Sequence, residues 1–207
     1  LLRASQAANL VGALVKRIVA IVQARMGSSR LPGKVLSPIC DRPMLWHIVE
    51  RVSAVPALAD IVVATSHTPA DDPLREFGQR FGAQVFSGSL DDVLDRFYRA
   101  APHYQADVVL RVTGDCPLFD PELVSRMLQS FLNHETLDHI GVAAGAGVAQ
   151  NTYCGRYPTG LDAELTAFGA LETAWRDATH SLDREHVTPL IWRQPERFRV
   201  ATYGSPV

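Results

Sequence analysis

The sequence predicts an α/β protein in which helices cover both faces of a mostly parallel sheet. Short apolar runs rich in β-branched residues alternate with amphipathic segments of helical length, the pattern of a doubly wound sheet. Two glycine-containing polar segments directly follow two of the apolar runs, at the strand ends where such sheets bind ligands. Hydrophobic residues make up 47% of the 207 residues, enough to bury one sizeable core without disulfides.

The first half of the chain alternates strand and helix. The run over residues 18–22 has the length and β-branched content of a buried parallel strand. The helix expected next places Leu45, Ile48 and Val52 on one face, and a right-handed βαβ unit results. The elements expected after the first strand are a helix over 43–52, a strand over 61–65, a helix over 72–81, a strand over 84–86, a helix over 91–104 and a strand over 107–112.

The second half is less regular. A helix over residues 121–133 begins with Pro121, which suits the first turn of a helix. The glycine- and alanine-rich segment 141–147 is expected to be a loop or an edge strand. Further expected elements are a strand over 163–166, a helix over 167–178 and a strand over 197–203. We therefore predict a single domain over residues 18–207, with a Rossmann-like, three-layer α/β/α fold.

Residues 1–17 precede this domain, and their apolar stretch is too short and too interrupted to span a bilayer. They are expected to be a helical extension, a cloning remnant or a processed end.

The formal net charge of −2 argues against a nucleic-acid binder, which needs a dense basic surface. Cys40, Cys116 and Cys154 are odd in number and match no zinc spacing, so we expect a cytoplasmic protein.

The loop after the first strand carries three cations, Arg25, Arg30 and Lys34. Cations so close together repel one another unless an anion lies between them, and phosphates accept bidentate arginine contacts well. The loop also has Gly27, which allows close backbone approach, and donors from Ser28 and Ser29. We interpret it as a triphosphate site, with a solvated basic turn as the alternative.

The loop matches no common phosphate motif. A Walker loop requires a hydroxyl residue after Gly33-Lys34 to hold magnesium, and Val35 stands there instead.

The second polar segment follows the strand over 107–112, where Gly114 lets the backbone come near a ligand. Pro117 bars a helix directly after Asp115, so this carboxylate should lie at the sheet edge as a magnesium ligand. An Asp that only stabilises its own turn is the alternative.

The segment over residues 23–36 resembles, residue for residue, the signature loop of the cytidylyltransferases, a family that includes spore-coat polysaccharide and acylneuraminate enzymes. The resemblance runs from about residue 18 to the end of the chain. It implies the nucleotide-diphospho-sugar transferase fold, transfer of CMP from CTP to a sugar with release of pyrophosphate, Mg²⁺ on Asp115, and a homodimer. In this interpretation Arg25, Arg30, Lys34 and Asp115 are the catalytic residues.

The resemblance also implies which residues contact each substrate. The nucleotide-side residues are Ala24, Arg25, Gly27, Ser28, Ser29, Arg30, Lys34, Ala64, Thr65, Ser66, Gly88, Thr113 and Gly114. The sugar-side residues are Asp162, Glu164, Arg184, Glu185 and His186. Strand alternation sends Asp162 and Glu164 to one face, and His186 is expected near the start of an amphipathic helix, where packing or capping competes with catalysis. An i,i+4 surface ion pair is the simplest account of Asp92 and Arg96.

Family members continue past the last predicted strand into an Asp-containing segment that helps to bind the metal, whereas this sequence stops at Val207. We expect either that the C-terminal segment is missing or that Asp162 or Glu164 replaces its carboxylate. Two other functions compete with the transferase. A glycosyltransferase of the related fold would normally show an Asp-x-Asp pair, which Asp115-Cys116-Pro117 does not supply. A regulatory module would bind the nucleotide without turning it over.

Overall fold

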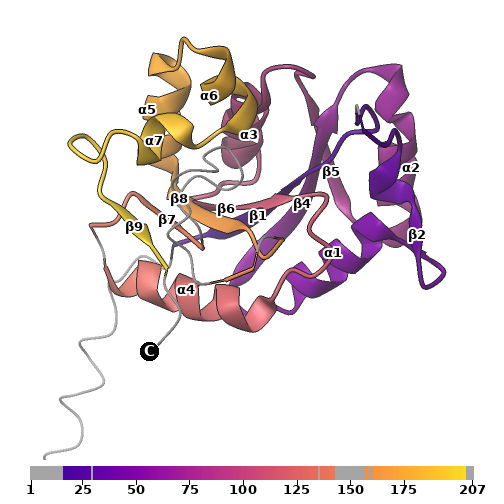
Figure 1. Cartoon of the computed structure of the whole chain (residues 1–207), viewed down its shortest axis with the longest axis horizontal. Helices are drawn as coiled ribbons and strands as arrows, with labels where there is room; N and C mark the ends of the chain where they lie inside the picture. The colour runs from indigo at the N-terminus through magenta and orange to yellow at the C-terminus, as the bar shows by residue number, and fades with distance from the viewer. Residues whose placement is uncertain (1–15, 29, 135, 143–156, 159, 204–207) are drawn as a thin grey trace, which may run out of the picture.

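The computed structural model describes residues 16–28, 30–134, 136–142, 157–158 and 160–203, and its centre is a seven-stranded sheet between two layers of helices (Figure 1). The strand order is β5-β4-β1-β6-β8-β7-β9. The bounds are β1 Ile18–Gln23, β4 Leu58–Ser66, β5 Gln84–Gly88, β6 Val108–Thr113, β7 His139–Gly141, β8 Ala163–Ala167 and β9 Val200–Thr202. A separate small hairpin joins β2 (Pro38–Ile39) to β3 (Arg42–Pro43).

The sheet has a parallel part and a mixed part. Strands β5, β4, β1 and β6 are all parallel, so their carboxyl ends lie at one edge. Strand β8 runs antiparallel to both β6 and β7, while β7 and β9 are parallel to each other. The start of β8 therefore lies beside the carboxyl end of β6, which brings the residues before Ala163 to the same edge.

Helices cover both faces of the sheet (Figure 1). One layer holds α1 (Met44–Ser53), α2 (Asp72–Phe81) and α4 (Pro121–Asn133). The other layer holds α3 (Val93–His103), α5 (Phe168–Asp177), α6 (Ser181–His186) and α7 (Pro189–Trp192). Two short 3-10 turns, η1 (Lys34–Leu36) and η2 (Pro69–Asp71), follow the ends of β1 and β4.

Strand β1 shows why the sequence forms this core. Ile18, Ala20 and Val22 pack into the layer of α1 and α4, whereas Val19 and Ile21 pack into the layer of α3 and α5. Alternate side chains thus point to opposite faces, and all five are at most 2% exposed. A strand buried on both faces reads as a continuous apolar run, as this one does.

The mostly parallel, three-layer fold is confirmed, and the helices over 72–81 and 121–133 have the expected bounds. The second half differs in detail. Strand β7 lies at His139–Gly141 and ends at the first residue of the segment in which we expected a loop or edge strand, while residues 143–147 lie outside the described part. Two short helices, α6 and α7, lie where a helix near His186 was expected. His186 is the last residue of α6, and α7 begins three residues later at Pro189. No described helix is long and apolar enough to cross a membrane.

Candidate active site

A cleft of about 520 Å³ opens at the carboxyl edge of the parallel strands. It lies where β1 and β6 end, where β8 begins and where α6 ends, so residues far apart in sequence meet there. The residues that we predicted and that line this cleft are Ala24, Arg25, Ser28, Arg30, Lys34, Thr113, Gly114, Asp115, Asp162, Glu185 and His186. The two polar segments singled out from the sequence are therefore two walls of one cavity.

Lys34 and Asp115 connect these two walls. Gly33 has a left-handed φ of 72°, which starts η1 and places Lys34 at its first position. The Lys34 Nζ lies 2.6 Å from the Asp115 Oδ2, with side-chain exposures of 26% and 44%. Burial raises the pKa of the Asp115 carboxyl, but the hydrogen bond and charge of Lys34 outweigh it and hold the pKa below its ordinary value. The candidate metal ligand is therefore an anion at neutral pH.

Gly114 has a packing role that the sequence did not reveal. Its backbone N–H donates to the Gln23 carbonyl at 2.8 Å, and a Cβ at this position would lie 2.6 Å from that oxygen. A side chain would therefore force the ends of β1 and β6 apart. Gly114 also lines the cleft, as expected, but the close approach that requires glycine is between two strands.

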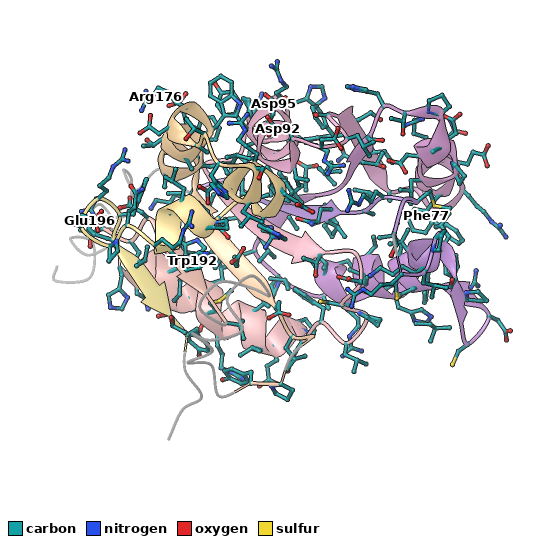
Figure 2. All side chains as sticks on the ribbon, turned by 45° about the horizontal axis from the view of Figure 1, so that its top comes forward. Phe77, Asp92, Asp95, Arg176, Trp192 and Glu196 are labelled. Atoms are coloured by element: carbon teal, nitrogen blue, oxygen red, sulfur yellow. The ribbon has the colours of Figure 1, made fainter. Side chains whose placement is uncertain are left out.

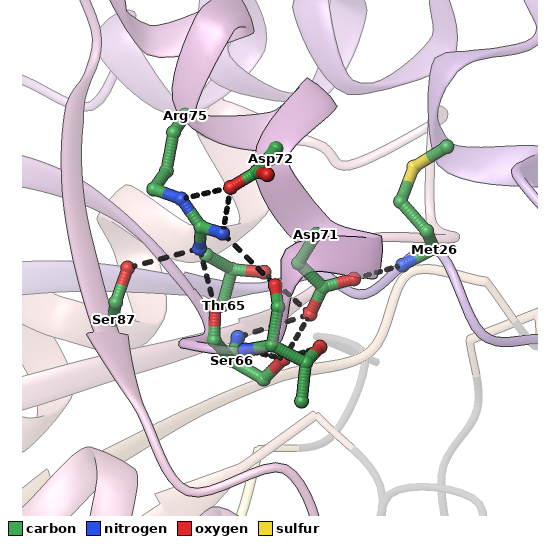
Figure 3. Close-up of polar contacts among 8 residues, drawn as sticks. Met26, Thr65, Ser66, Asp71, Asp72, Arg75 and Ser87 are labelled. Carbon is green, nitrogen blue, oxygen red and sulfur yellow. Dashed lines mark hydrogen bonds and ion pairs between the residues drawn. The ribbon is translucent and has the colours of Figure 1, made fainter.

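Asp71 holds the cationic loop in place through a hydrogen bond to the backbone of Met26 (Figure 3). Its Oδ1 accepts the Met26 backbone N–H at 2.8 Å. Its Oδ2 accepts the Thr65 hydroxyl at 3.0 Å and the Ser66 N–H and hydroxyl at 3.1 and 2.5 Å. Burial raises the pKa of this 1% exposed acid, but the hydrogen bonds, Ser66 first, lower it below its ordinary value. Sequence analysis missed Asp71, because an Asp before a helix resembles an ordinary cap.

This network accounts for several expected nucleotide contacts that do not line the cleft. Thr65 and Ser66 are fully buried and bond to Asp71, and Ala64 is fully buried in the core between the sheet and α3. Gly27 is exposed outside the lining residues. Arg75 donates to the Ser66 carbonyl at 2.7 Å, which holds the end of β4 further in place (Figure 3). Ser29 lies outside the described residues.

The expected surface pair of Asp92 and Arg96 is wrong. Asp92 caps α3 by accepting the Asp95 backbone N–H at 2.8 Å, and its other oxygen pairs with Arg184. Asp92 and Asp95 lie together at the start of α3 (Figure 2), where Asp95 accepts the Trp175 indole N–H of α5 at 2.9 Å. Arg184 therefore fixes α6 to α3 and does not line the cleft. Arg96 is 2% exposed and does line it.

Gly88 does not line the cleft either, but it makes room for Arg96. A Cβ at Gly88 would lie 3.1 Å from the Arg96 Cγ and 3.4 Å from its Cα. The absence of a side chain at the end of β5 therefore lets the first turns of α3 pack close to the sheet. The prediction of Gly88 as a nucleotide contact stays a prediction, while its packing against Arg96 is observed.

Glu164 lies inside the protein and not in the cleft. It stands opposite Arg111 in the β6–β8 register, and the Glu164 Oε2 accepts the Arg111 Nη1–H at 2.7 Å. The Thr188 hydroxyl also donates to Glu164, at 3.0 Å. Side-chain exposures of 5% for Arg111 and 1% for Glu164 mark this as a buried pair. Because β8 is antiparallel, Asp162 lies at the cleft edge, whereas Glu164 is two residues further into the sheet.

Three expected sugar-side residues do reach the cleft, namely Asp162, Glu185 and His186. Burial lowers the pKa of His186, with a smaller opposing contribution from Glu185, so its imidazole is neutral at pH 7. Asp115 and Asp162 both act on the thiol of Cys116, whose pKa is raised by burial and by these two carboxylates. Both acids line the cleft.

The described residues contain no group of three or more His, Cys, Asp or Glu that could hold a metal ion. Magnesium usually takes one or two carboxylates and completes its coordination with water and substrate phosphates. Asp115 and Asp162 supply hard oxygen ligands of this kind beside the cationic loop. The cleft therefore fits a divalent cation that binds together with a phosphate-bearing substrate.

The sequence matches the family described as Cytidylyltransferase over residues 19–206. The chain belongs to the cytidylyltransferase family. This assigns it to the CTP-dependent nucleotidyltransferases and confirms the family resemblance found from the loop over residues 23–36. The cytidylyltransferase match also covers every lining residue of the cleft.

Relatives of this cytidylyltransferase include an uncharacterized protein of Methanocaldococcus jannaschii, 39% identical over 92% of this chain and 73% of the relative. The spore coat polysaccharide biosynthesis protein SpsF of Bacillus subtilis is 34% identical over 91% of this chain and 75% of its own length. A solved cytidylyltransferase structure from Leptospira borgpetersenii superposes with a TM-score of 0.82 at 31% identity, covering 92% of this chain and 76% of that one.

A CMP:2-keto-3-deoxy-manno-octonic acid synthetase solved with CTP superposes with a TM-score of 0.72 at 21% identity, covering 92% of this chain and 90% of the synthetase. At this level of identity the superposition shows a shared fold. Together with the family match, it confirms the nucleotidyltransferase type of Rossmann-like fold that the sequence predicted.

Proposed function

We propose that this cytidylyltransferase activates a sugar by transferring CMP from CTP, for the synthesis of a surface polysaccharide. The observation that carries the proposal is the cleft in which Arg25, Arg30 and Lys34 face the carboxylate of Asp115. Such a cleft offers cations for a triphosphate and an acid for a divalent ion within one cavity. The polysaccharide context is supported by the 34% identity to a spore coat polysaccharide biosynthesis protein.

In the proposed reaction a sugar hydroxyl oxygen attacks the α-phosphorus of CTP. A bond forms between that oxygen and phosphorus, the bond from the α-phosphorus to the bridging oxygen breaks, and pyrophosphate leaves with the electron pair. Arg25, Arg30 and Lys34 neutralise the charge that builds up on the departing pyrophosphate. The sugar hydroxyl loses its proton, and His186 is suited to accept it because its imidazole is neutral and lines the cleft.

Asp115 and Asp162 are the residues that we propose to hold a divalent cation, with Mg²⁺ as the ion. When bound, such an ion supplies positive charge to the phosphate oxygens of the nucleotide. Lys34 would then leave its ion pair with Asp115 and donate to the triphosphate. A structural neighbour from Mycobacterium tuberculosis, with a TM-score of 0.60 and 15% identity, was solved as a complex with manganese.

The acceptor end of the cleft is proposed to lie at Asp162, Glu185 and His186, which line it beside the start of β8 and the end of α6. Carboxylates there can accept hydrogen bonds from sugar hydroxyls. A homodimer, which the family resemblance implies, and a cytoplasmic location, which the odd number of cysteines favours, complete the proposal.

A thermal-shift panel with CTP, UTP, ATP and GTP, each with and without Mg²⁺, tests the nucleotide assignment. A ligand at about one hundred times its dissociation constant adds roughly 2.7 kcal/mol of stability. We expect a selective response to CTP that Mg²⁺ enhances. A selective response to another nucleotide would contradict the choice of CTP. Release of pyrophosphate on addition of a sugar acceptor would then exclude a module that binds the nucleotide without turnover.

A further inference from the structure

Arg96 is a buried cation in the cleft that the proposed reaction does not use. It is 2% exposed, lies on the first turns of α3, and lines the same cavity as Arg25 and Asp115. Its Nε and Nη1 atoms are buried, and neither has a hydrogen-bond partner in the described part of the chain. Burying a charged donor without a partner is strongly unfavourable, so the guanidinium of Arg96 lacks the hydrogen-bond acceptors that would offset its burial.

The acids around Arg96 do not accept hydrogen bonds from its guanidinium. Asp71 is close enough to act on its charge, but four hydrogen bonds from Met26, Thr65 and Ser66 occupy the two Asp71 oxygens. On the same helix Asp92 pairs with Arg184, and Asp95 pairs with Arg99 and Trp175.

Glu185 lines the cleft from α6 but forms no ion pair with Arg96. Of these four carboxylates, three are therefore occupied by other donors, and the fourth forms no ion pair with Arg96.

A second cation points to the missing partner. Arg25 carries the same charge as Arg96 and lines the same cleft. Burial is the main reason that the pKa of Arg96 falls to about 10, with the repulsion from Arg25 adding to it. At neutral pH the guanidinium stays charged. Two arginines that line one cleft, one of them with buried donors that lack a partner, form a site for an oxyanion that can accept from both.

We propose that Arg96 and Arg25 together bind one oxyanion group of a substrate, and that Arg96 is a further binding residue of the cleft. The inference rests on the proposed function for the identity of the substrates. The oxyanion is either a phosphate of the nucleoside triphosphate or the acid group of an acidic sugar acceptor. The buried donors of Arg96 find an acceptor only when that oxyanion is present. Arg96 therefore recognises the charged group of the ligand and not the base.

The test compares wild-type protein with Arg96→Gln by calorimetric titration of CTP, cytidine, inorganic pyrophosphate and 3-deoxy-manno-octulosonate. Hydrogen bonds to charged groups support a loss of about 10- to 100-fold in affinity for the ligand that carries the oxyanion. A loss for CTP and pyrophosphate with unchanged cytidine binding assigns the site to the triphosphate. A loss for the sugar acid alone assigns it to the acceptor. Arg96→Lys should fall between the two proteins, because it keeps the charge without the planar fork.

Two outcomes would overturn the inference. Equal affinities of wild type and Arg96→Gln for all four ligands would remove Arg96 from the site, and parallel losses for CTP and cytidine would mean that it contacts the base. Arg99→Gln, one turn further along α3 and 61% exposed, is the matched control and should bind every ligand as wild type does. Failure of wild-type protein to bind CTP would reject the proposed function, while pyrophosphate binding would still decide the inference.

The ligand-free stability separates binding from structure. Arg96→Gln removes a buried charge that lacks a partner, so the variant should unfold at the same urea concentration as wild type or at a higher one. A lower midpoint would indicate that Arg96 supports the fold and would count against the inference.

Discussion

Two ion pairs of similar length lie near the same edge of the sheet and differ in burial. Lys34 and Asp115 meet at 2.6 Å in the cleft, where the side chains keep 26% and 44% of their exposure. Arg111 and Glu164 meet at 2.7 Å inside the protein, with exposures of 5% and 1%. The first pair can exchange its partners for a ligand, because water and substrate reach it. Arg111 also lines the cleft, but Glu164 does not, and the second pair joins β6 to β8.

The contrast shows that an acid near a strand end is not enough to identify a functional group. From the sequence we predicted Asp115 as a magnesium ligand and Glu164 as a sugar-side residue, and both lie in or beside neighbouring strands of one sheet. Burial and strand direction separate them: Asp115 follows the end of β6, whereas Glu164 lies within the antiparallel β8 and pairs across the ladder. We therefore assign stability to the inner pair and chemistry to the outer pair.

The largest expected effect is on stability. Arg111→Met leaves Glu164 buried and without its cation, which should lower the free energy of unfolding by about 3–5 kcal/mol. Urea unfolding followed by circular dichroism measures this change. Arg99→Met removes the cation of an exposed pair with Asp95 and should leave the urea midpoint nearly unchanged, because exposed ion pairs contribute little to stability. Similar losses in both variants would mean that burial does not distinguish the two kinds of pair.

The next largest effect is on catalysis. Lys34→Met should reduce CTP-dependent pyrophosphate release by about 100- to 1,000-fold, because one cation that stabilises the departing charge is gone. Its free energy of unfolding should change by less than about 1 kcal/mol, since the pair with Asp115 is solvent-accessible. Initial rates and urea unfolding of the same preparation give both numbers. An active Lys34→Met protein would break the assignment of chemistry to the outer pair.

The smallest expected effect is on how the free energy of unfolding depends on pH, through the buried carboxyl of Asp71. The pKa of Asp71 is lowered in the folded protein from 3.8, so the unfolded chain binds its proton first as the pH falls. Asp71 therefore stabilises the fold above about pH 4, and this contribution is lost as the pH falls through the lowered pKa. The slope of unfolding free energy against pH between 5 and 3 should be shallower in Asp71→Asn than in wild type. Equal slopes would show that the hydrogen bonds to Asp71 do not lower its pKa in the folded protein.

The parallel half of the fold could be predicted because its signals are local. Strand β1 is buried on both faces and reads as an unbroken apolar run, and its loop carries a recognisable set of cations. The helices over 72–81 and 121–133 follow from amphipathic patterns and a Pro in the first turn. Asp115 and the loop cations could be placed in one cleft because parallel strands end at one edge.

The remaining features depend on contacts between distant segments. Nothing near Glu164 in the sequence reveals that β8 runs antiparallel and pairs it with Arg111. Asp71 resembles a helix cap until the end of β4 and the backbone of Met26 are seen around it. Arg96 reads as an i+4 partner of Asp92 until Arg184 is found in that place. Each of these side chains has its role set by a partner that sequence spacing does not report.

The most direct test of the account is a crystal structure of the protein with CTP and Mn²⁺, whose anomalous scattering locates the ion. We predict that the triphosphate lies against Arg25, Arg30 and Lys34, that the ion lies on Asp115, and that the Lys34–Asp115 pair is open while Arg111 and Glu164 remain paired. A triphosphate bound elsewhere, or bound with the Lys34–Asp115 pair intact and no ion on Asp115, would contradict the division between the two ion pairs.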